Sequence, residues 1–307
     1  DLDSKKFSKN LNDIEGFKSI RDIKISEKEN EISILGVQGL ENNCGRLILS
    51  KYKYNFDKLE MKLTDEEKLW ISEENCNYIV KTSGGRVEKI RNNYFVSTGI
   101  FQTPVRSGII KENWSQKMNS SFGKIIKIDE QNNSSIYASG FRNPQGLFVT
   151  KKPEKIFATD HGPNGGDEIN VIEKNMNYGW PCISFGKLYS KKINDENIYP
   201  NINSIDGCDD KKIYKNPIYS FSRINNGISQ GVYYNSQYFK KFYDSIIVSS
   251  LKGKKLYRFN LDGDKENIIS HEEIYIGSRI RDILISKKGK LILITDKGFL
   301  VEIEKNI

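Results

Sequence analysis

A short strand-like module repeats along this chain, and it constrains the fold more than any other feature of the sequence. Residues 281–294 follow the pattern of residues 21–34, and both copies begin with Arg-Asp-Ile. Each copy has an alternating strand, a polar turn and a second, apolar strand. Such strands have an apolar face that they cannot bury alone, and a spacing of about 40–50 residues is typical of β-propeller blades.

The remaining strand signals predict an all-β protein, since short apolar runs bounded by turn residues recur throughout the chain. About five blade-like units can be counted, whereas six is a commoner number for a closed ring. We therefore expect a six-bladed β-propeller, with either one uncounted blade or an incomplete first blade. A large β-sandwich is the alternative that periodicity leaves open. We expect one domain over residues 1–307, with a polar arm at residues 1–17 and an insertion at about residues 183–215.

The net charge of +8 invites a nucleic-acid hypothesis. The lysines, however, form pairs beside turns rather than a basic stripe, at residues 151–152, 191–192, 211–212, 240–241, 254–255 and 287–288. Lysines at turns and sheet edges usually solvate a sheet and block edge pairing. We expect no nucleic-acid partner and keep a polyanion-binding role only as a third hypothesis.

The four cysteines indicate the compartment. They lack metal-site spacing, their number is even, and Cys182 and Cys208 flank the polar insertion. We predict the disulfides Cys182–Cys208 and Cys44–Cys76, and hence a periplasmic or secreted protein. Four buried free thiols are the alternative. No apolar run approaches the roughly 20 residues of a membrane helix, so we expect no membrane span.

Three loops in the centre of the chain predict a binding site. Residues 139–147, 160–170 and 177–181 are dense in Gly, Pro, Asn and paired acids beside aromatic residues. Glycine lets a ligand approach the main chain, and Asp167-Glu168 offers the hard oxygen atoms that Ca2+ prefers. Ordinary turns would explain one such loop, but three within forty residues indicate a built site.

These loops resemble the glucose/sorbosone dehydrogenase family. The segments that carry the resemblance are Gly140-Phe-Arg-Asn-Pro-Gln-Gly-Leu147, His161-Gly-Pro-Asn-Gly-Gly-Asp-Glu-Ile-Asn170 and Asn177-Tyr-Gly-Trp-Pro181. The resemblance covers roughly residues 18–305, although the family's N-terminal blade is not recognisable. It implies a soluble six-bladed propeller that uses pyrroloquinoline quinone (PQQ) and Ca2+ to oxidise aldose sugars.

The resemblance also implies roles for individual residues. Arg142 and Asn143 match residues that contact the quinone, and Arg142 is also a candidate catalytic residue. The main-chain carbonyls of Gly162 and Pro163 match ligands of the catalytic Ca2+. The remaining matches are a second, structural Ca2+ site at Asp167, Glu168 and Tyr178, a lysine beside a cofactor carboxylate at Lys252, and two cofactor arginines at Arg279 and Arg281.

Physical chemistry independently favours these cations. PQQ is a flat tricarboxylate, to which the planar fork of arginine and the point charge of lysine are suited. Arg279 and Arg281 stand two residues apart on a predicted strand and therefore point to the same face. Each cation alone would be read as a surface charge.

The chain departs from the family at the catalytic base. The family's histidine stands in a His-x-Gly-Gly-Arg pattern, and Thr82 takes its place here. The supporting aspartate is replaced by Ile100, and the histidine of Gly-His-Arg-Asn by Phe141. A neutral hydroxyl cannot accept a proton as a histidine does near neutral pH. The two histidines present, His161 and His271, are both interpreted as structural or solvated.

Two functions follow from these observations. The first is a PQQ- and Ca2+-dependent sugar dehydrogenase with an altered base. The alternative is a catalytically inactive propeller that binds a sugar, a quinone or a protein partner.

Overall fold

The chain forms five antiparallel β-sheets within the residues that the structure describes. The structure is a computed structural model, and it describes residues 17–57, 60–76, 83–101, 113–186, 207–209, 211–221 and 226–305. The first sheet has the order β1-β2-β3-β4, with β5 paired to β3. Its strands are β1 (Phe17–Ser26), β2 (Glu31–Gly39), β3 (Cys44–Asp57), β4 (Glu60–Ile71) and β5 (Asn75–Cys76).

The other four sheets follow in chain order, each strand pairing with the next. The second sheet contains β6 (Gly84–Ile90), β7 (Asn93–Thr98), β8 (Lys124–Ile128) and β9 (Ser134–Ser139). The third contains β10 (Pro144–Val149), β11 (Ile156–Asp160), β12 (Asp167–Ile172) and β13 (Tyr219–Phe221). The fourth contains β14 (Ile228–Tyr234), β15 (Ser245–Ser250), β16 (Lys255–Leu261) and β17 (Ile268–Tyr275), and the fifth β18 (Ile280–Ile285), β19 (Leu291–Thr295) and β20 (Leu300–Ile303). Two short 3-10 turns, η2 (Trp114–Gln116) and η4 (Lys240–Phe242), also occur in the described part of the chain.

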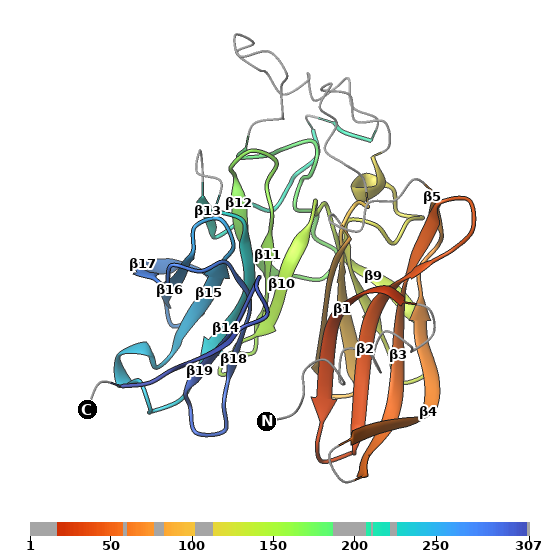
Figure 1. The fold of residues 1–307 in the computed structure, drawn as a ribbon. Coiled ribbons are helices and arrows are strands. Elements are labelled where there is room, and N and C mark those ends of the chain that lie inside the picture. The colour runs from red at the N-terminus through yellow and green to blue at the C-terminus, as the bar shows by residue number, and fades with distance from the viewer. Residues whose placement is uncertain are drawn as a thin grey trace.

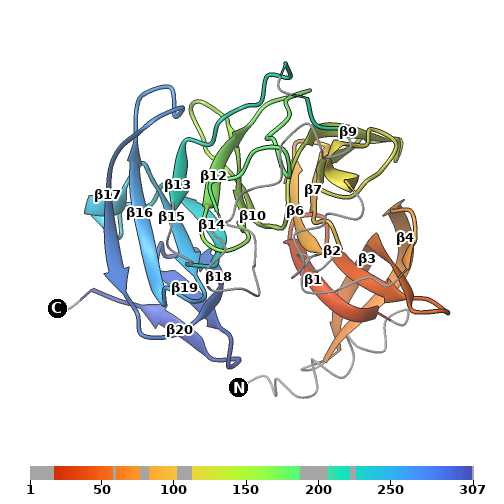
Figure 2. The same ribbon diagram turned by 90° about the horizontal axis from the view of Figure 1, so that it is seen from above.

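The sheets surround a common axis in chain order, as the blades of a β-propeller do (Figures 1 and 2). The all-β propeller prediction is thus confirmed, but the prediction of six blades is wrong, because the described residues form five sheets. The first sheet is also not incomplete, since it has four strands in order plus β5; the three-stranded sheet is the fifth. The predicted N-terminal arm ends one residue early, because Phe17 already belongs to β1, and residues 1–16 lie outside the described part.

Alternating side chains fill the spaces between consecutive sheets. Tyr94 and Val96 of β7 join a cluster with the first sheet, whereas Phe95 faces the third sheet. In β15, Ile246 and Val248 pack toward the third sheet and Ile247 toward the fifth. Because successive side chains of a strand point to opposite faces, one strand contributes to two interfaces.

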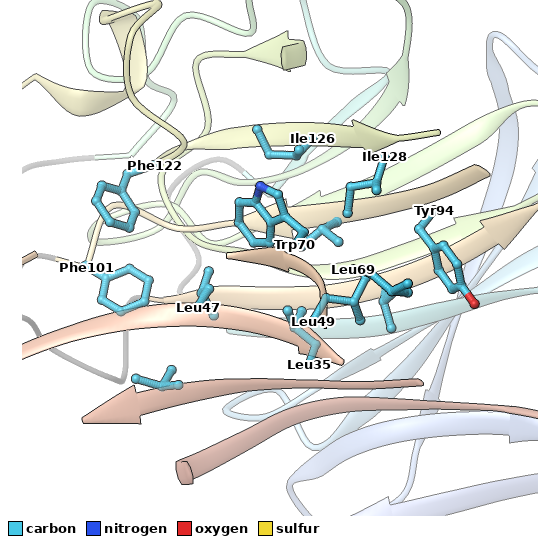
Figure 3. Packing of buried hydrophobic residues seen from close by; sticks show 13 residues of the cluster. Leu35, Leu47, Leu49, Leu69, Trp70, Tyr94, Phe101, Phe122, Ile126 and Ile128 are labelled. Atoms are coloured by element: carbon cyan, nitrogen blue, oxygen red, sulfur yellow. The ribbon is translucent and has the colours of Figure 1, made fainter. Parts of the chain in front are cut away.

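The cluster between the first and second sheets shows this packing directly (Figure 3). Leu69 and Trp70 at the end of β4 lie against Ile126 and Ile128 of β8. Both leucine and tryptophan are at least nine-tenths buried, at 4% and 7% exposure. Fully burying one such side chain contributes about 1.5–3 kcal/mol, so the interface is held mainly by apolar contact.

Every innermost strand carries a register shift close to its start. The shifts lie at Ile20/Asp22 in β1, Gly84/Arg86 in β6, Pro144/Gly146 in β10, Ile228/Gly231 in β14 and Ile280/Asp282 in β18. A bulge of this kind bends the strand and redirects a side chain. All five sheets therefore have an irregular segment at the corresponding place beside the axis.

Beside these bulges, Arg86 of the second sheet contacts residues of the first, third and fifth sheets. Its guanidinium forms ion pairs with Asp22 of the first sheet at 3.3 Å and Asp282 of the fifth at 2.7 Å. It also donates to the carbonyl oxygens of Gln145 and Arg281 at 2.8 and 3.0 Å. No apolar cluster in the described part joins the first sheet to the fifth, so this buried guanidinium is the main link between them.

Both predicted disulfides are confirmed. Cys44 pairs with Cys76, joining β3 to β5, and Cys182 pairs with Cys208 across the predicted insertion. No cysteine is free, which rules out the alternative of four thiols. Most of the insertion itself, residues 187–206 and 210, lies outside the described residues.

Lys124 is a fully buried cation at the start of β8. Its Nζ donates to the carbonyl oxygens of Trp114 and Phe122 at 2.7 and 2.8 Å, which holds η2 against the second sheet. Burial lowers the pKa of Lys124 to about 7, against a raising effect of Glu73. The ammonium group is therefore stabilised by main-chain dipoles rather than by a paired carboxylate.

Arg86→Met should destabilise the fold by about 3–5 kcal/mol, because it leaves the carboxylates of Asp22 and Asp282 without their buried partner. Urea denaturation would measure the change in the free energy of unfolding. Adding Asp22→Asn and Asp282→Asn to the same variant should restore part of the loss. A variant within 0.5 kcal/mol of the parent, the range typical of surface changes, would contradict the linking role.

The stability of the protein should rise with pH between about 7 and 10.5 on account of Lys124. In that range the unfolded chain keeps the proton of Lys124 and the folded chain releases it, so raising the pH favours folding. Unfolding at several pH values should show this slope, and Lys124→Met should reduce it. An unchanged slope in the variant would show that Lys124 keeps an ordinary pKa in the fold.

Candidate functional site

The candidate residues of the third sheet gather around the buried carboxylate of Asp160. Its oxygens accept the backbone N–H groups of Arg142 at 2.8 Å and Asn143 at 2.6 Å. Burial raises the pKa of Asp160 to about 6, although these two hydrogen bonds oppose the shift. Asp160 ends β11 and so fixes the loop that enters β10.

Arg142 lies over the loop that follows Asp160. Its Nη1 donates to the carbonyl oxygens of His161 at 2.9 Å and Gly162 at 2.8 Å, and its guanidinium stacks 5.5 Å above the ring of Trp180. Two main-chain carbonyls thus converge on one positively charged nitrogen. Gly162 is needed here, because a Cβ would lie 2.1 Å from the carbonyl oxygen of Gly165.

Asp167 uses both carboxylate oxygens on main-chain amides. Oδ1 accepts from Gly162 at 3.0 Å, and Oδ2 from Gly227 at 2.7 Å and Ile228 at 3.3 Å. The residue therefore joins the 160–167 loop to the first residues of β14. In this structure Asp167 organises the backbone of the site.

Glu168 and Asn170 form a buried polar pair on β12. Asn170 donates its Nδ2 to Oε2 of Glu168 at 3.3 Å, while the buried Oδ1 of Asn170 has no hydrogen-bond partner among the described residues. Burial and then the charge of Asp160 raise the pKa of Glu168 to about 8.

Tyr178 has its hydroxyl turned away from these acids. The hydroxyl donates to the carbonyl oxygen of Val171 at 2.5 Å and accepts the N–H of Glu173 at 2.9 Å. Its ring stacks on that of Phe141 at a centroid distance of 4.8 Å. Tyr178 nevertheless lines a small, partly open pocket, shared with Arg142, Asp160, Gly162, Glu168 and Trp180.

Residues 226–229 connect this pocket to the candidates of the last two sheets. Asn226 accepts the backbone N–H of Lys252 at 2.8 Å, and the Ser229 hydroxyl donates to the carbonyl oxygen of Arg281. His161 contacts the carbonyl oxygen of Ile228 through its Nε2. The pocket itself does not include Lys252, Arg279 or Arg281. One short segment thus contacts the loop from His161 to Asp167 and the main chain of both Lys252 and Arg281.

Arg279 and Arg281 share one carboxylate. The Nε of Arg279 lies 2.7 Å from Oδ2 of Asp296, and the Nε of Arg281 pairs with the other oxygen. These arginine side chains are 43% and 49% exposed, and Lys252 is exposed as well. In both pairs the contact is made through Nε.

The residues that replace the family's catalytic pair are placed only in part. Thr82 lies outside the described residues, although the adjoining Ser83 accepts the backbone N–H of Gly99 at 2.7 Å. Ile100 is buried, and its own N–H donates to the carbonyl oxygen of Arg142 at 3.0 Å. The segment at the base position is therefore linked through Gly99 and Ile100 to Arg142.

The two histidines occupy different surroundings. His161 is half-buried beside the pocket, and burial lowers its pKa. His271 lies on β17, where its ring packs 5.3 Å from that of Tyr219 and 5.7 Å from that of Phe259. His271 thus contacts the aromatic cluster between the third and fourth sheets rather than the candidate site.

The atoms at the two implied Ca2+ sites fit a Ca2+ ion to different degrees. The carbonyls of His161 and Gly162 converge on a positive charge, and carbonyl oxygens are ligands that Ca2+ accepts. At the second site, Glu168 and the unpartnered oxygen of Asn170 fit a cation. The carboxylate of Asp167 and the hydroxyl of Tyr178 are already committed to main-chain groups. No group of three or more His, Cys, Asp or Glu side chains that could hold a metal ion occurs in the described part of the chain.

Sequence reasoning missed three residues that organise the site, Arg86, Asp160 and Asp296. Asp160 directly precedes the His161 motif, and Asp296 follows the apolar strand of the last repeat. Their roles depend on partners that only the fold brings close. Sequence reasoning also missed Arg21. The Arg-Asp-Ile start that the two repeats share could have pointed to it.

The family model for "Glucose / Sorbosone dehydrogenase" matches residues 40–302. The chain belongs to the glucose/sorbosone dehydrogenase family. The resemblance stated from the central loops is thereby confirmed.

Individual relatives agree with this family. Aldose sugar dehydrogenase YliI of Escherichia coli is 26% identical over 199 residues, which are 60% of this chain and 51% of the relative. A solved glucose dehydrogenase matches with a TM-score of 0.78 at 20% identity, over 95% of this chain and 84% of that one. The PQQ-bound aldose sugar dehydrogenase of Streptomyces coelicolor matches with a TM-score of 0.59 at 19% identity, over 90% and 85%. The chain spans about half the length of the curated relatives it matches.

The described part of the chain contains no helix long and apolar enough to cross a membrane.

Asp167→Ala should lower the free energy of unfolding by about 1–3 kcal/mol, because three buried or partly buried amides lose their acceptor. If Asp167 acts through these amides alone, the loss should be the same with Ca2+ and with a chelator. Thermal denaturation in both conditions would measure it, with the exposed Asp264→Ala as control. A loss seen only with Ca2+ would instead make Asp167 a metal ligand.

Proposed function

We propose that this chain binds PQQ and Ca2+ and oxidises a sugar hydroxyl with them, as an altered member of its family. The observation that carries the proposal is the contact network of residues 226–229, which links the Arg142 loop to Lys252 and Arg281. An anionic, planar ligand needs several cations within reach, and these main-chain contacts connect the segments that carry Lys252 and Arg281 to the loop that Arg142 contacts.

The chain's own residues would divide the work as follows. Arg142 and Asn143, fixed by Asp160, would contact the quinone, while Lys252, Arg279 and Arg281 would bind its carboxylates. The carbonyls of Gly162 and Pro163 would hold the catalytic Ca2+, and Glu168 with Asn170 the structural one. When bound, PQQ supplies a two-electron acceptor for the hydride of the sugar, with Ca2+ polarising its carbonyl.

Oxidation of the sugar hydroxyl also requires a group that accepts its proton. Thr82 is neutral at the base position, and Ile100 places a buried apolar side chain where a supporting carboxylate would stand. General-base catalysis typically contributes 10²–10⁴-fold, so turnover without it would be slow. The second candidate function is therefore a propeller that binds a sugar or quinone without turnover, and the burial of Ile100 favours it.

An oxidising compartment is part of the proposal. Both disulfides join segments of the described chain, and disulfides persist mainly in periplasmic or secreted proteins. We propose the periplasm or the extracellular space as its location.

Lys252→Ala should weaken PQQ binding by about tenfold, since it removes one charge-assisted contact to a carboxylate. Arg279→Ala should have a similar effect. Quenching of protein fluorescence on titration with PQQ in Ca2+ buffer would measure the dissociation constant. Lys240→Ala, an exposed lysine on η4, is the matched control. The proposal fails if the parent protein does not bind PQQ at micromolar concentrations.

Thr82→His combined with Ile100→Asp should raise dye-linked sugar oxidation by about a hundredfold or more, because it restores the base and its support. Each single variant should gain less than the pair. PQQ affinity should stay within a few-fold, which separates turnover from binding. A parent that already turns over at the rate of the double variant would show that another group removes the proton.

A further inference from the structure

The fifth sheet ends in a strand whose outer edge is open. β20 pairs with β19 and with no other strand of the described part, so this sheet has three strands where the second, third and fourth have four. β20 lies on the outside of the ring (Figure 2). Phe299 and Leu300, at its beginning, are 63% and 69% exposed. An edge of this kind presents N–H and C=O groups to any extended segment within reach.

The exposed leucine belongs to an apolar row that crosses the sheet. Ile294 of β19 is the register partner of Leu300, and both share a face with Leu284 and Ile292 in the next row. Leu284 is exposed as well, whereas Ile292 and Ile294 are partly covered. The opposite face of the sheet packs on the fourth sheet. A further strand beside β20 would therefore find its uncovered apolar contact on the face of Leu300.

Chain order identifies the segment that would supply this strand. The outermost strand of one sheet leads directly to the innermost strand of the next, as from β9 to β10 through residues 140–143 and from β17 to β18 through residues 276–279. If the junction between the fifth and first sheets follows the same rule, the outermost strand of the fifth sheet precedes β1. Residues 1–16, which lie outside the described part, precede β1 in the sequence.

The sequence before β1 suits an outer strand. Residues 4–11 match β17 in length, since β17 contains eight residues. They leave residues 12–16 for the connection, which is one residue longer than the connections at the two junctions above. Phe7 and Leu11 lie an even number of residues apart, so they would share one face of a strand. The segment thus offers apolar side chains to one face of the fifth sheet.

The junction that this segment would bridge has little apolar contact. No apolar cluster of the described residues joins the fifth sheet to the first. The described contacts between them include those of Arg86 and an exposed ion pair between Lys287 and Glu27. A strand that belongs to the fifth sheet and continues into β1 would join the two sheets through the chain itself. Arg281 lies on β18, so the same strand would steady the sheet that carries this candidate arginine.

We propose that residues 4–11 dock on the fifth sheet as its fourth strand, antiparallel to β20. Leu11 stands opposite Leu300 and extends the apolar row. Lys9 then stands opposite Glu302, and opposite charges directly across two strands are favourable. This docking does not depend on the proposed function. The competing occupant of the edge is β20 of a second copy, whose binding would depend on protein concentration.

Hydrogen exchange of the full chain, read by mass spectrometry, tests the docking. The double variant Phe7→Asp and Leu11→Asp should speed the exchange of the β20 amides about tenfold or more, because it removes the apolar contacts that hold the strand. Ser8→Asp with Asn10→Asp adds the same charge on the other face and should leave β20 near the parent. The amides of β17, already an outermost strand, should not change in either variant.

Unchanged protection of β20 in the Phe7 and Leu11 variant would overturn the proposal, as would fast exchange of β20 in the parent. Protection that grows with protein concentration, together with a dimer in sedimentation, would assign the edge to a second copy and also overturn it. A variant that exchanges fast in every strand has unfolded, and a cross-link in an otherwise unchanged chain then decides.

The cross-link uses cysteines introduced at Lys9 and Glu302. The four native cysteines are already paired, so the introduced pair is distinct. Residues opposite each other in an antiparallel pair have Cβ atoms about 4.5–5.5 Å apart, which allows a disulfide under mild oxidation. The expected product is an intrachain cross-link at low protein concentration. Its absence, or an interchain product instead, would overturn the proposal.

Discussion

The arrangement of the five sheets depends on one buried guanidinium. Consecutive sheets are joined by apolar clusters, but the first and the fifth are joined at the axis through Arg86 and the carboxylates of Asp22 and Asp282. A buried ion pair contributes little net stability, because desolvation offsets the attraction. What it does impose is geometry, since a displaced partner would leave a buried charge uncompensated. Arg86 therefore fixes the position of the sheets more than it stabilises them.

The strands that carry this link also carry the candidate site. The bulges that place Asp22 and Asp282 beside Arg86 also place Arg21 and Arg281, one residue earlier in each strand. Arg86 further holds the carbonyl oxygens of Arg281 and Gln145, and Gln145 donates its side chain to Asn143. A change in the packing of the sheets would consequently move candidate residues from three sheets together.

Local patterns predicted the parts of this molecule that depend on local physics. Period-two alternation located most strands, and turn residues bounded them; β5 and β13 were missed because each is short and pairs with one strand end. Both disulfides followed from an even count and from the polar insertion. The number of blades could not be derived, since it depends on how sheets close around an axis. The role of Asp160 was equally hidden, because its partners Arg142 and Asn143 lie 18 and 17 residues away.

Many polar groups of the candidate functional site contact one another, and this limits which ligands can bind there. The carbonyls that would bind a metal ion accept from Arg142, and the arginines that would bind a carboxylate hold Asp296. The carbonyls of His161 and Gly162 and the two arginines thus have intramolecular partners with the charge of their expected ligands. Binding must then exchange one set of contacts for another, and only the surplus appears as affinity. A ligand that brings a cation and several carboxylates together can contact both the main-chain carbonyls and the arginines. Neither a metal ion nor a simple acid alone can do this.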